Sequence, residues 1–254
     1  MFSNPREPER NRDKKAPIQQ LSIEVDESYL LLHLLRATEP SKFIAAHPCR
    51  SVTAVLADAS KASYSDVLIL LTDERGTEFS SALKRLHQVV APLPSFQQAL
   101  RETLELRAEV ELEWKSKARE STEIVRALTG FDIGHDIYRV FITHPSLRNG
   151  CYFGDQQIGW GGVNEWPNYR VVYLWHEILH DEQWLGTSDL NHALIELLTD
   201  NELRVRLNGG SYPPWEGHRE LDPLREKLLP DWRAYLEQDN RDIRKFIASQ
   251  VEKG

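Results

Sequence analysis

The stretch of sequence that decides the fold is His176-Glu177-Ile178-Leu179-His180, an H-E-x-x-H pattern. An α-helix advances about 100° and about 1.5 Å per residue, so the two histidines share one face about 6 Å apart along the axis. Both imidazoles can therefore reach one cation, and neutral imidazole suits zinc. Apolar residues between Tyr169 and Leu179 predict that the helix is mostly buried.

Glu177 follows the first histidine directly. From there its carboxylate can face a water at the metal without displacing it, which is the position of a general base. Catalytic zinc sites use three protein ligands and leave a fourth position open, so a further ligand is needed from another element. Gly186 is the expected C-cap of the motif helix.

The next segment predicts a second helix over 188–207, with Ser188 or Asp189 as its N-cap and glycines after its end. The polar residues that interrupt the apolar pattern of this segment are informative. Glu196 interrupts an apolar run, and an acidic residue in such a setting is paired, metal-bound or on a narrow polar stripe. His192, Glu196 and Asp200 follow at intervals of four residues and therefore lie on one helix face.

Together these segments resemble the gluzincin clan of zinc metallopeptidases, whose pattern is H-E-x-x-H on one helix and E-x-x-x-D on the next. The resemblance covers about 30 residues, from Tyr173 to Glu202. It implies Zn²⁺ as the cofactor and a zincin-like core. It implies that His176, His180 and Glu196 bind the zinc and that Glu177 is the general base. It also implies that Asp200 orients the His176 ring without itself binding the metal.

The chain also departs from the clan. Only 15 residues separate His180 from Glu196, and Ile195 stands where the clan's second motif has asparagine. His192 is the main alternative for the third ligand, by analogy with zinc peptidases that take a histidine from the following helix. In gluzincins a tyrosine or histidine after the third ligand stabilises the transition state, and Tyr212 and His218 occupy that region here.

Three β-prone runs precede the motif helix, over 138–143, 151–154 and 157–162. They predict a small antiparallel or mixed sheet. Such a sheet can offer an exposed strand edge to a peptide, or it can simply pack on the helix. The sequence leaves both interpretations open.

The expected fold class is α+β and predominantly helical. Residues 1–16 are expected to form a disordered tail, 17–130 a mostly helical N-terminal region, and 131–254 a zincin-like catalytic region with C-terminal helices. Helices are predicted over 29–36, 77–90 and 95–128, and 66–72 is either strand or helix. Two C-terminal helices, 219–229 and 231–252, are expected to break at Pro230.

The composition narrows the class of protein. A net charge of −8 argues against non-specific nucleic-acid binding, and no apolar run is long enough to span a membrane. Two cysteines and no secretory signal favour a cytoplasmic location. We therefore expect a zinc-dependent metallohydrolase, a peptidase acting on peptides or proteins. The alternative is a zinc-binding protein with a structural or partner-binding role; the oligomeric state does not follow from the sequence.

Overall fold

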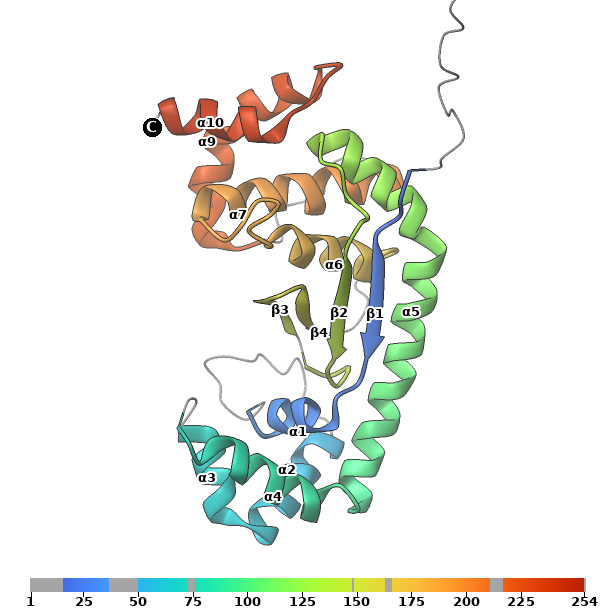
Figure 1. Ribbon diagram of the computed structural model, residues 1–254, viewed down its shortest axis with the longest axis vertical. Helices are drawn as coiled ribbons and strands as arrows, with labels where there is room; N and C mark the ends of the chain where they lie inside the picture. Colours follow the sequence, from blue (N-terminus) through green and yellow to red (C-terminus); the bar gives the residue numbers. More distant parts are fainter. Residues whose placement is uncertain are drawn as a thin grey trace, which may run out of the picture.

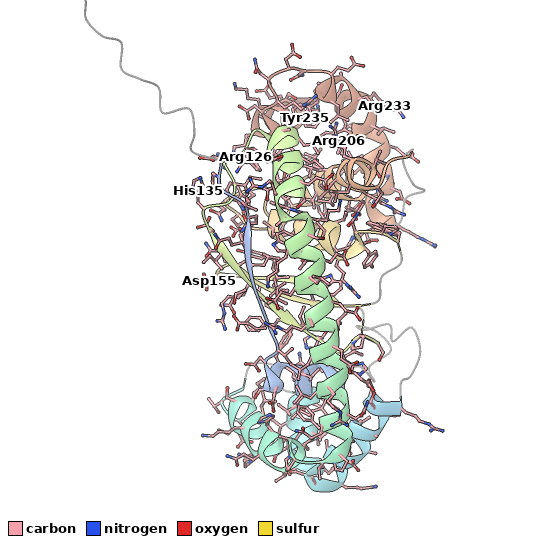
Figure 2. All side chains as sticks on the ribbon, turned by 90° about the vertical axis from the view of Figure 1, so that its right-hand side faces the viewer. Arg126, His135, Asp155, Arg206, Arg233 and Tyr235 are labelled. Carbon is pink, nitrogen blue, oxygen red and sulfur yellow. The ribbon has the colours of Figure 1, made fainter. Side chains whose placement is uncertain are left out.

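A single long helix, α5 (Pro94–Thr129), runs from the N-terminal helices at one end of the molecule to the C-terminal helices at the other (Figures 1 and 2). Proline at its first position suits a helix start, since the missing N–H would have no partner there. Gly130 ends it with a φ of 75°, in the left-handed region that favours glycine. The predicted helix over 95–128 is confirmed.

The computed structural model describes residues 16–36, 50–72, 76–147, 149–162, 166–210 and 217–253. The expected disordered tail lies outside these residues except for Ala16. Within them the chain is mostly helical with one small sheet, as the α+β expectation requires (Figure 1).

Four short helices pack with the start of α5 around an aliphatic core that includes Leu34, Val55 and Leu86. The predicted helices over 29–36 and 77–90 are confirmed, and the ambiguous segment 66–72 is helical. The sequence analysis did not predict the second of the four. They are α1 (Glu27–Arg36), α2 (Arg50–Ala62), α3 (Tyr64–Thr72) and α4 (Phe79–Val90).

The sheet is mixed, with strand order β1-β2-β4-β3. β1, β2 and β4 are parallel, while β3 pairs antiparallel with β4 and forms one edge. The three predicted runs are strands, and β1 is an additional strand in a region expected to be mostly helical. The bounds are β1 (Gln20–Glu24), β2 (Ile137–Ile142), β3 (Asn149–Gly154) and β4 (Gln157–Gly161).

The two faces of the sheet differ because side chains alternate along a strand. Ile158 and Trp160 are buried in the larger core with the motif helix. On the other face Gly159 lies against Tyr29 of α1, where an added Cβ would come 2.6 Å from the Phe153 ring. The first face therefore positions the candidate site, and the second is partly covered by α1.

The motif helix is α6 (Tyr169–Leu179), with His180 as its C-cap. Gly186 is not the C-cap, so that prediction is wrong. The helix ends earlier because the N–H of His180 already bonds back to Glu177 and Ile178, and Gly186 adopts a φ of 76° in the following turn.

The second predicted helix is confirmed but irregular. Ser188 caps α7 (Asp189–Glu196) and accepts a hydrogen bond from the Asn191 N–H at 3.3 Å. The helix continues as a π-helix, η1 (Leu197–Leu203), and then as α8 (Arg204–Asn208). A π-helical turn is rare and is often found at functional sites.

The C-terminal segment contains a short 3₁₀ turn, η2 (Arg219–Leu221), followed by α9 (Asp222–Leu236) and α10 (Ile243–Lys253). The expected break at Pro230 is wrong, because α9 continues through it. Proline removes one backbone hydrogen bond, but Trp232 and Tyr235 are buried on the same helix, and the Tyr235 hydroxyl donates to Leu128 O at 2.7 Å. Tertiary packing therefore holds the helix intact.

None of the helices in the described ranges combines the length and the apolar character that a membrane crossing needs.

Replacement of His33 by glutamine is expected to flatten the acid side of the stability profile. Burial lowers the pKa of His33 to about 4, with Arg36 lowering it further, whereas in the unfolded chain it returns to about 6.5. Protons therefore bind the unfolded state more tightly, so the stabilisation is complete above pH about 6.5 and is lost as the pH falls towards about 4. Urea unfolding across this range should show a smaller loss in His33→Gln than in the wild type. The exposed His135→Gln is the control, and equal losses in all three proteins would contradict the assignment.

Candidate metal centre

The motif helix α6 is buried on nearly every side, so its polar groups must find partners inside the protein. Trp175 packs against Trp114 of α5 with ring centroids 5.8 Å apart. The buried Arg170 pairs with Glu109 at 2.5 Å and with Glu113 at 3.3 Å, both on α5. These contacts fix α6 against the long helix and leave its histidine face towards α7.

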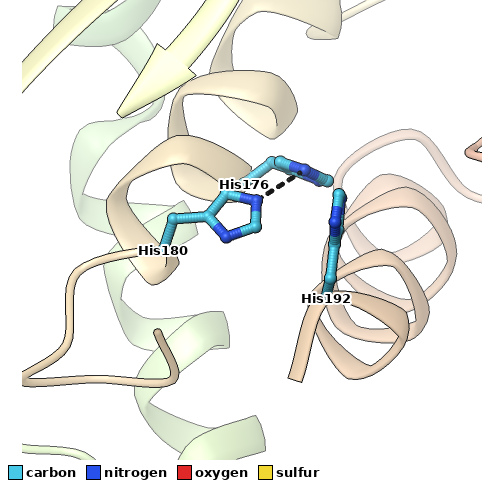
Figure 3. Close-up of side chains that lie close together, drawn as sticks. All are labelled: His176, His180 and His192. Atoms are coloured by element: carbon cyan, nitrogen blue, oxygen red, sulfur yellow. Dashed lines mark hydrogen bonds between the residues drawn. The ribbon is translucent and has the colours of Figure 1, made fainter. Parts of the chain in front are cut away.

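Three imidazoles converge between α6 and α7 (Figure 3). His176 and His180 come from α6 and His192 comes from α7, and one nitrogen from each lies within 4.8 Å of the other two. The Nε2 atoms of His176 and His180 are 3.2 Å apart. Two nitrogens bound tetrahedrally to one zinc at about 2.05 Å would be about 3.3 Å apart, so the separation suits a shared ion.

The other ring nitrogens of His176 and His180 face oxygen atoms. His180 Nδ1 lies 3.2 Å from Gly186 O, and an imidazole N–H there donates to the carbonyl. His176 Nδ1 lies 3.5 Å from Thr199 Oγ1, whose own hydrogen is donated to Ile195 O at 2.8 Å. Such partners place the proton on Nδ1 and leave both Nε2 atoms free to bind a metal.

The turn that carries Gly186 is held by a buried polar network. The Tyr138 hydroxyl donates to Asp181 Oδ2 at 2.8 Å and accepts from Trp184 Nε1 at 2.9 Å. Asp181 Oδ1 also accepts from the Gln183 N–H at 3.0 Å. This network connects β2 to the residues directly after His180, so it fixes the carbonyl that orients the His180 ring.

His192 contributes the third imidazole of the group. Its Nε2 is buried and has no hydrogen-bond partner within the described residues, and Glu196 Oε1 lies 3.9 Å away, beyond hydrogen-bond distance. Burial lowers the pKa of His192 to about 4 and also lowers the pKa of His176 and His180. All three imidazoles are therefore neutral near pH 7, the state in which histidine binds metals.

Glu196, the expected third ligand, lies in an adjacent group with His192 and His218. Its side chain is 1% exposed and forms a short ion pair with Arg225. Oε1 also accepts hydrogen bonds from the N–H and from Nδ1 of His218, both at 2.8 Å. A Cβ on Gly217 would lie 2.5 Å from this carboxylate, so the pair is tightly enclosed.

Asp200, expected to orient His176, lines the same cavity as that ring, and its neighbour Thr199 faces the ring as well. Thr199 Oγ1 is 3.5 Å from His176 Nδ1, and Asp200 Oδ1 is 3.2 Å from Thr199 Oγ1. Both residues belong to the π-helix, whose wider turn rotates side chains away from α-helical spacing. Sequence reasoning did not find Thr199, because no signal in the sequence indicated the π turn; the role of Asp200 stays a prediction.

Glu177, the expected general base, points from α6 towards the edge strand β3. Its side chain is buried, and a Cβ on Gly150 would lie 2.6 Å from Glu177 Oε1. Burial raises the pKa of Glu177 to about 8, an effect opposed by His218 and by a hydrogen bond from the Tyr152 backbone. Sequence reasoning found Glu177 but not Gly150, whose lack of a side chain makes room for the carboxylate.

A cavity of about 310 Å³ borders part of this site, and His180 and His192 are not among the described residues that line it. Its walls include His176, Glu177, Glu196, Asp200 and His218, together with Trp160, Tyr169 and Tyr173. The structure thus brings His218 to the same cavity as Glu177. Tyr212, the other residue considered for transition-state stabilisation, lies outside the described residues.

Comparisons of the chain with protein-family models, with curated proteins and with solved structures find no match.

Removal of the His192 imidazole should weaken zinc binding far more than removal of the Glu196 charge. His192→Ala deletes one of the three converging imidazoles. The loss of zinc affinity should therefore exceed the roughly 10- to 100-fold that is typical when a residue hydrogen-bonded to a metal ligand is replaced. Glu196→Gln should change affinity by less than about tenfold, because that carboxylate is already paired with Arg225. Competition with a chromophoric chelator measures both. The control is His135→Ala, and the opposite ranking of the two variants would make Glu196 the third ligand.

Proposed function

We propose that the protein is a zinc-dependent metallohydrolase that cleaves peptide bonds. The observation that carries this proposal is the convergence of His176, His180 and His192, of which His176 lines the same cavity as the buried Glu177. A structural zinc site is normally closed by four protein ligands, whereas three ligands beside a base suit catalysis.

The residues present fit a zinc ion. Their donor set is three neutral imidazoles, and the buried His192 Nε2 has no hydrogen-bond partner within the described residues. Bound there, zinc would lower the pKa of a water and polarise the scissile carbonyl. We assign the third ligand to His192, because Glu196 is already compensated by Arg225 and His218.

Glu177 is the proposed general base. It borders the same cavity as His176, and its carboxylate lies against the edge strand at Gly150. It would take the proton from the attacking water and return it to the leaving amine. His218 lines the same cavity. With its Nδ1–H donated to Glu196 Oε1, it would act as an imidazolium whose Nε2–H donates to the oxygen that becomes negative during attack.

The edge strand β3 supports a peptide as the substrate. β3 pairs with β4 on one side, and no further strand pairs with it in the described part of the chain. Its residues Gly150 and Tyr152 adjoin Glu177. An extended peptide that adds to this edge would bring its backbone to the base. This order, with a mixed sheet followed by the motif helix and a ligand-bearing second helix, is the basis for proposing a zincin-like core.

Glu177→Gln should retain zinc and lose hydrolysis. Glutamine has nearly the same shape but cannot accept the proton, and a positioned base contributes about 10²- to 10⁴-fold to a rate. Turnover of a fluorescence-quenched peptide library, with zinc content by plasma mass spectrometry, measures both properties. Glu202→Gln is the matched control, a buried acid on η1 paired with Arg206. Zinc-loaded wild type that cleaves no peptide would indicate the non-catalytic alternative, and no zinc in the wild type would refute the site.

Gly150→Ala should lower turnover without affecting zinc. The added methyl group would meet Glu177 Oε1 and push the carboxylate from its position, and a displacement of about 1 Å can cost on the order of 100-fold in rate. Cys151→Ala, on the same strand with its side chain on the opposite face, is the control. Single-turnover rates of the zinc-loaded proteins test this, and an unchanged rate in Gly150→Ala would mean that Glu177 is not held by β3.

A further inference from the structure

A second hollow, of about 440 Å³, lies on the face of the sheet opposite α6. Its apolar walls come from α1 and α4 and from the strands, where Tyr29, Leu32, Leu83, Phe141 and Phe153 line it. We call it the distal pocket. Figure 1 shows α1 next to the end of the sheet, and Tyr29 and Leu32 of this helix line the pocket. None of the roles assigned above uses it.

Phe153 connects the distal pocket to the edge strand. It belongs to β3, and its large apolar side chain is 48% exposed instead of being packed into the core. Gly150, three residues earlier on β3, lines the catalytic cavity. Three residues of strand span about 10 Å. The pairing of β3 with β4 shifts register between Tyr152 and Gly154, and the contacts of Phe153 with Tyr29 of α1 place its side chain on the face opposite the catalytic cavity. One strand edge thus passes from the catalytic cavity to the distal pocket.

A peptide that pairs with the free edge of β3 would also pass from the catalytic cavity to the distal pocket. The residue beside Gly150 would face the catalytic cavity, and the residue three positions along would face the distal pocket. Antiparallel pairing is the more stable arrangement per residue, so the peptide would run opposite to β3. The residue at the distal pocket would then be the third or fourth before the cleaved bond.

The lining selects an apolar side chain. Two phenylalanines, a tyrosine and two leucines form most of the wall, and none of the described residues that line the pocket is a lysine or arginine. A charged side chain would lose its hydration there without gaining an opposite charge, and Asp26 in the lining would repel an acidic one. The volume is within the range of pockets that enclose organic groups, so a phenylalanine, tryptophan or leucine side chain fits.

We propose that the distal pocket is a specificity subsite, which binds an apolar side chain located three or four residues before the scissile bond. The proposal rests on the proposed peptidase function. It adds a preference that the catalytic cavity alone does not produce, because the pocket is on the other face of the sheet.

The test is cleavage of a random decapeptide library by the zinc-loaded wild type, with products sequenced by mass spectrometry. We expect Phe, Trp and Leu to be enriched at the third or fourth position before the cleaved bond. Phe153→Ala and Leu32→Ala should each reduce that enrichment by roughly tenfold, the usual effect of truncating a hydrophobic pocket. Leu112→Ala, a 71% exposed leucine on α5, should leave it unchanged.

Three outcomes would overturn the proposal: enrichment that persists in both pocket variants, cleavage with no preference at those positions, or a preference only after the cleaved bond.

A binding measurement separates this proposal from the proposed function. Fluorescein-labelled decapeptides with Phe or Asp at the tested position are titrated against zinc-loaded Glu177→Gln protein, with and without Phe153→Ala. Tighter binding of the Phe peptide that is lost in Phe153→Ala supports the pocket even if the wild type cleaves nothing. Hydrolysis without any dependence on Phe153 supports the catalytic function alone.

Discussion

The desolvation of the polar groups on α6 is the constraint that the surrounding structure must satisfy. The helix carries an arginine, two histidines and a glutamate, all nearly buried, and each would destabilise the fold without a partner. Arg170 forms ion pairs with two glutamates of α5. The Nδ1 atoms of the two histidines face a carbonyl and a hydroxyl, and Glu177 accepts a hydrogen bond from the backbone of β3. The long helix, the turn after the motif and the edge strand therefore each compensate one polar group of α6.

Two hydrogen-bond acceptors lie one turn apart on α7, the Glu196 carboxylate and His192 Nε2, and they differ in the partners that the fold provides. Glu196 is neutralised by a buried arginine and held by His218, so its burial is compensated within the protein. His192 Nε2 is buried without a hydrogen-bond partner in the described part of the chain. A buried, neutral nitrogen that faces two other imidazoles is best compensated by a cation, which is why we place His192 rather than Glu196 at the metal.

The edge strand β3 lines both the cavity beside the histidines and the distal pocket. On one face its glycine gives room to the carboxylate of Glu177, and on the other its phenylalanine forms part of an apolar pocket closed by α1. The N-terminal helices are thereby connected to the site through the sheet, although they are far from it in sequence. A peptide bound at this edge would contact both parts of the protein at once.

The sequence by itself determined the elements whose signals are local. The long helix, the three strands before the motif, and the helices that carry His176, His180 and His192 follow from periodicity and β-propensity. The H-E-x-x-H spacing also determined that two imidazoles share a helix face. Strand β1 and helix α2 were missed, and Pro230 was expected to break a helix that Trp232 and Tyr235 hold intact through burial.

Only the tertiary structure decided which groups surround the two motif histidines. Glu196 and His192 lie on one face of the same helix, and their spacing could not reveal that Arg225, distant in the sequence, pairs with the glutamate. The π-helix brought Thr199 to His176 where α-helical spacing favoured Asp200. Gly150 and the distal pocket likewise depend on strand pairing. These contacts join residues far apart along the chain, whose proximity is set by packing and not by any local pattern.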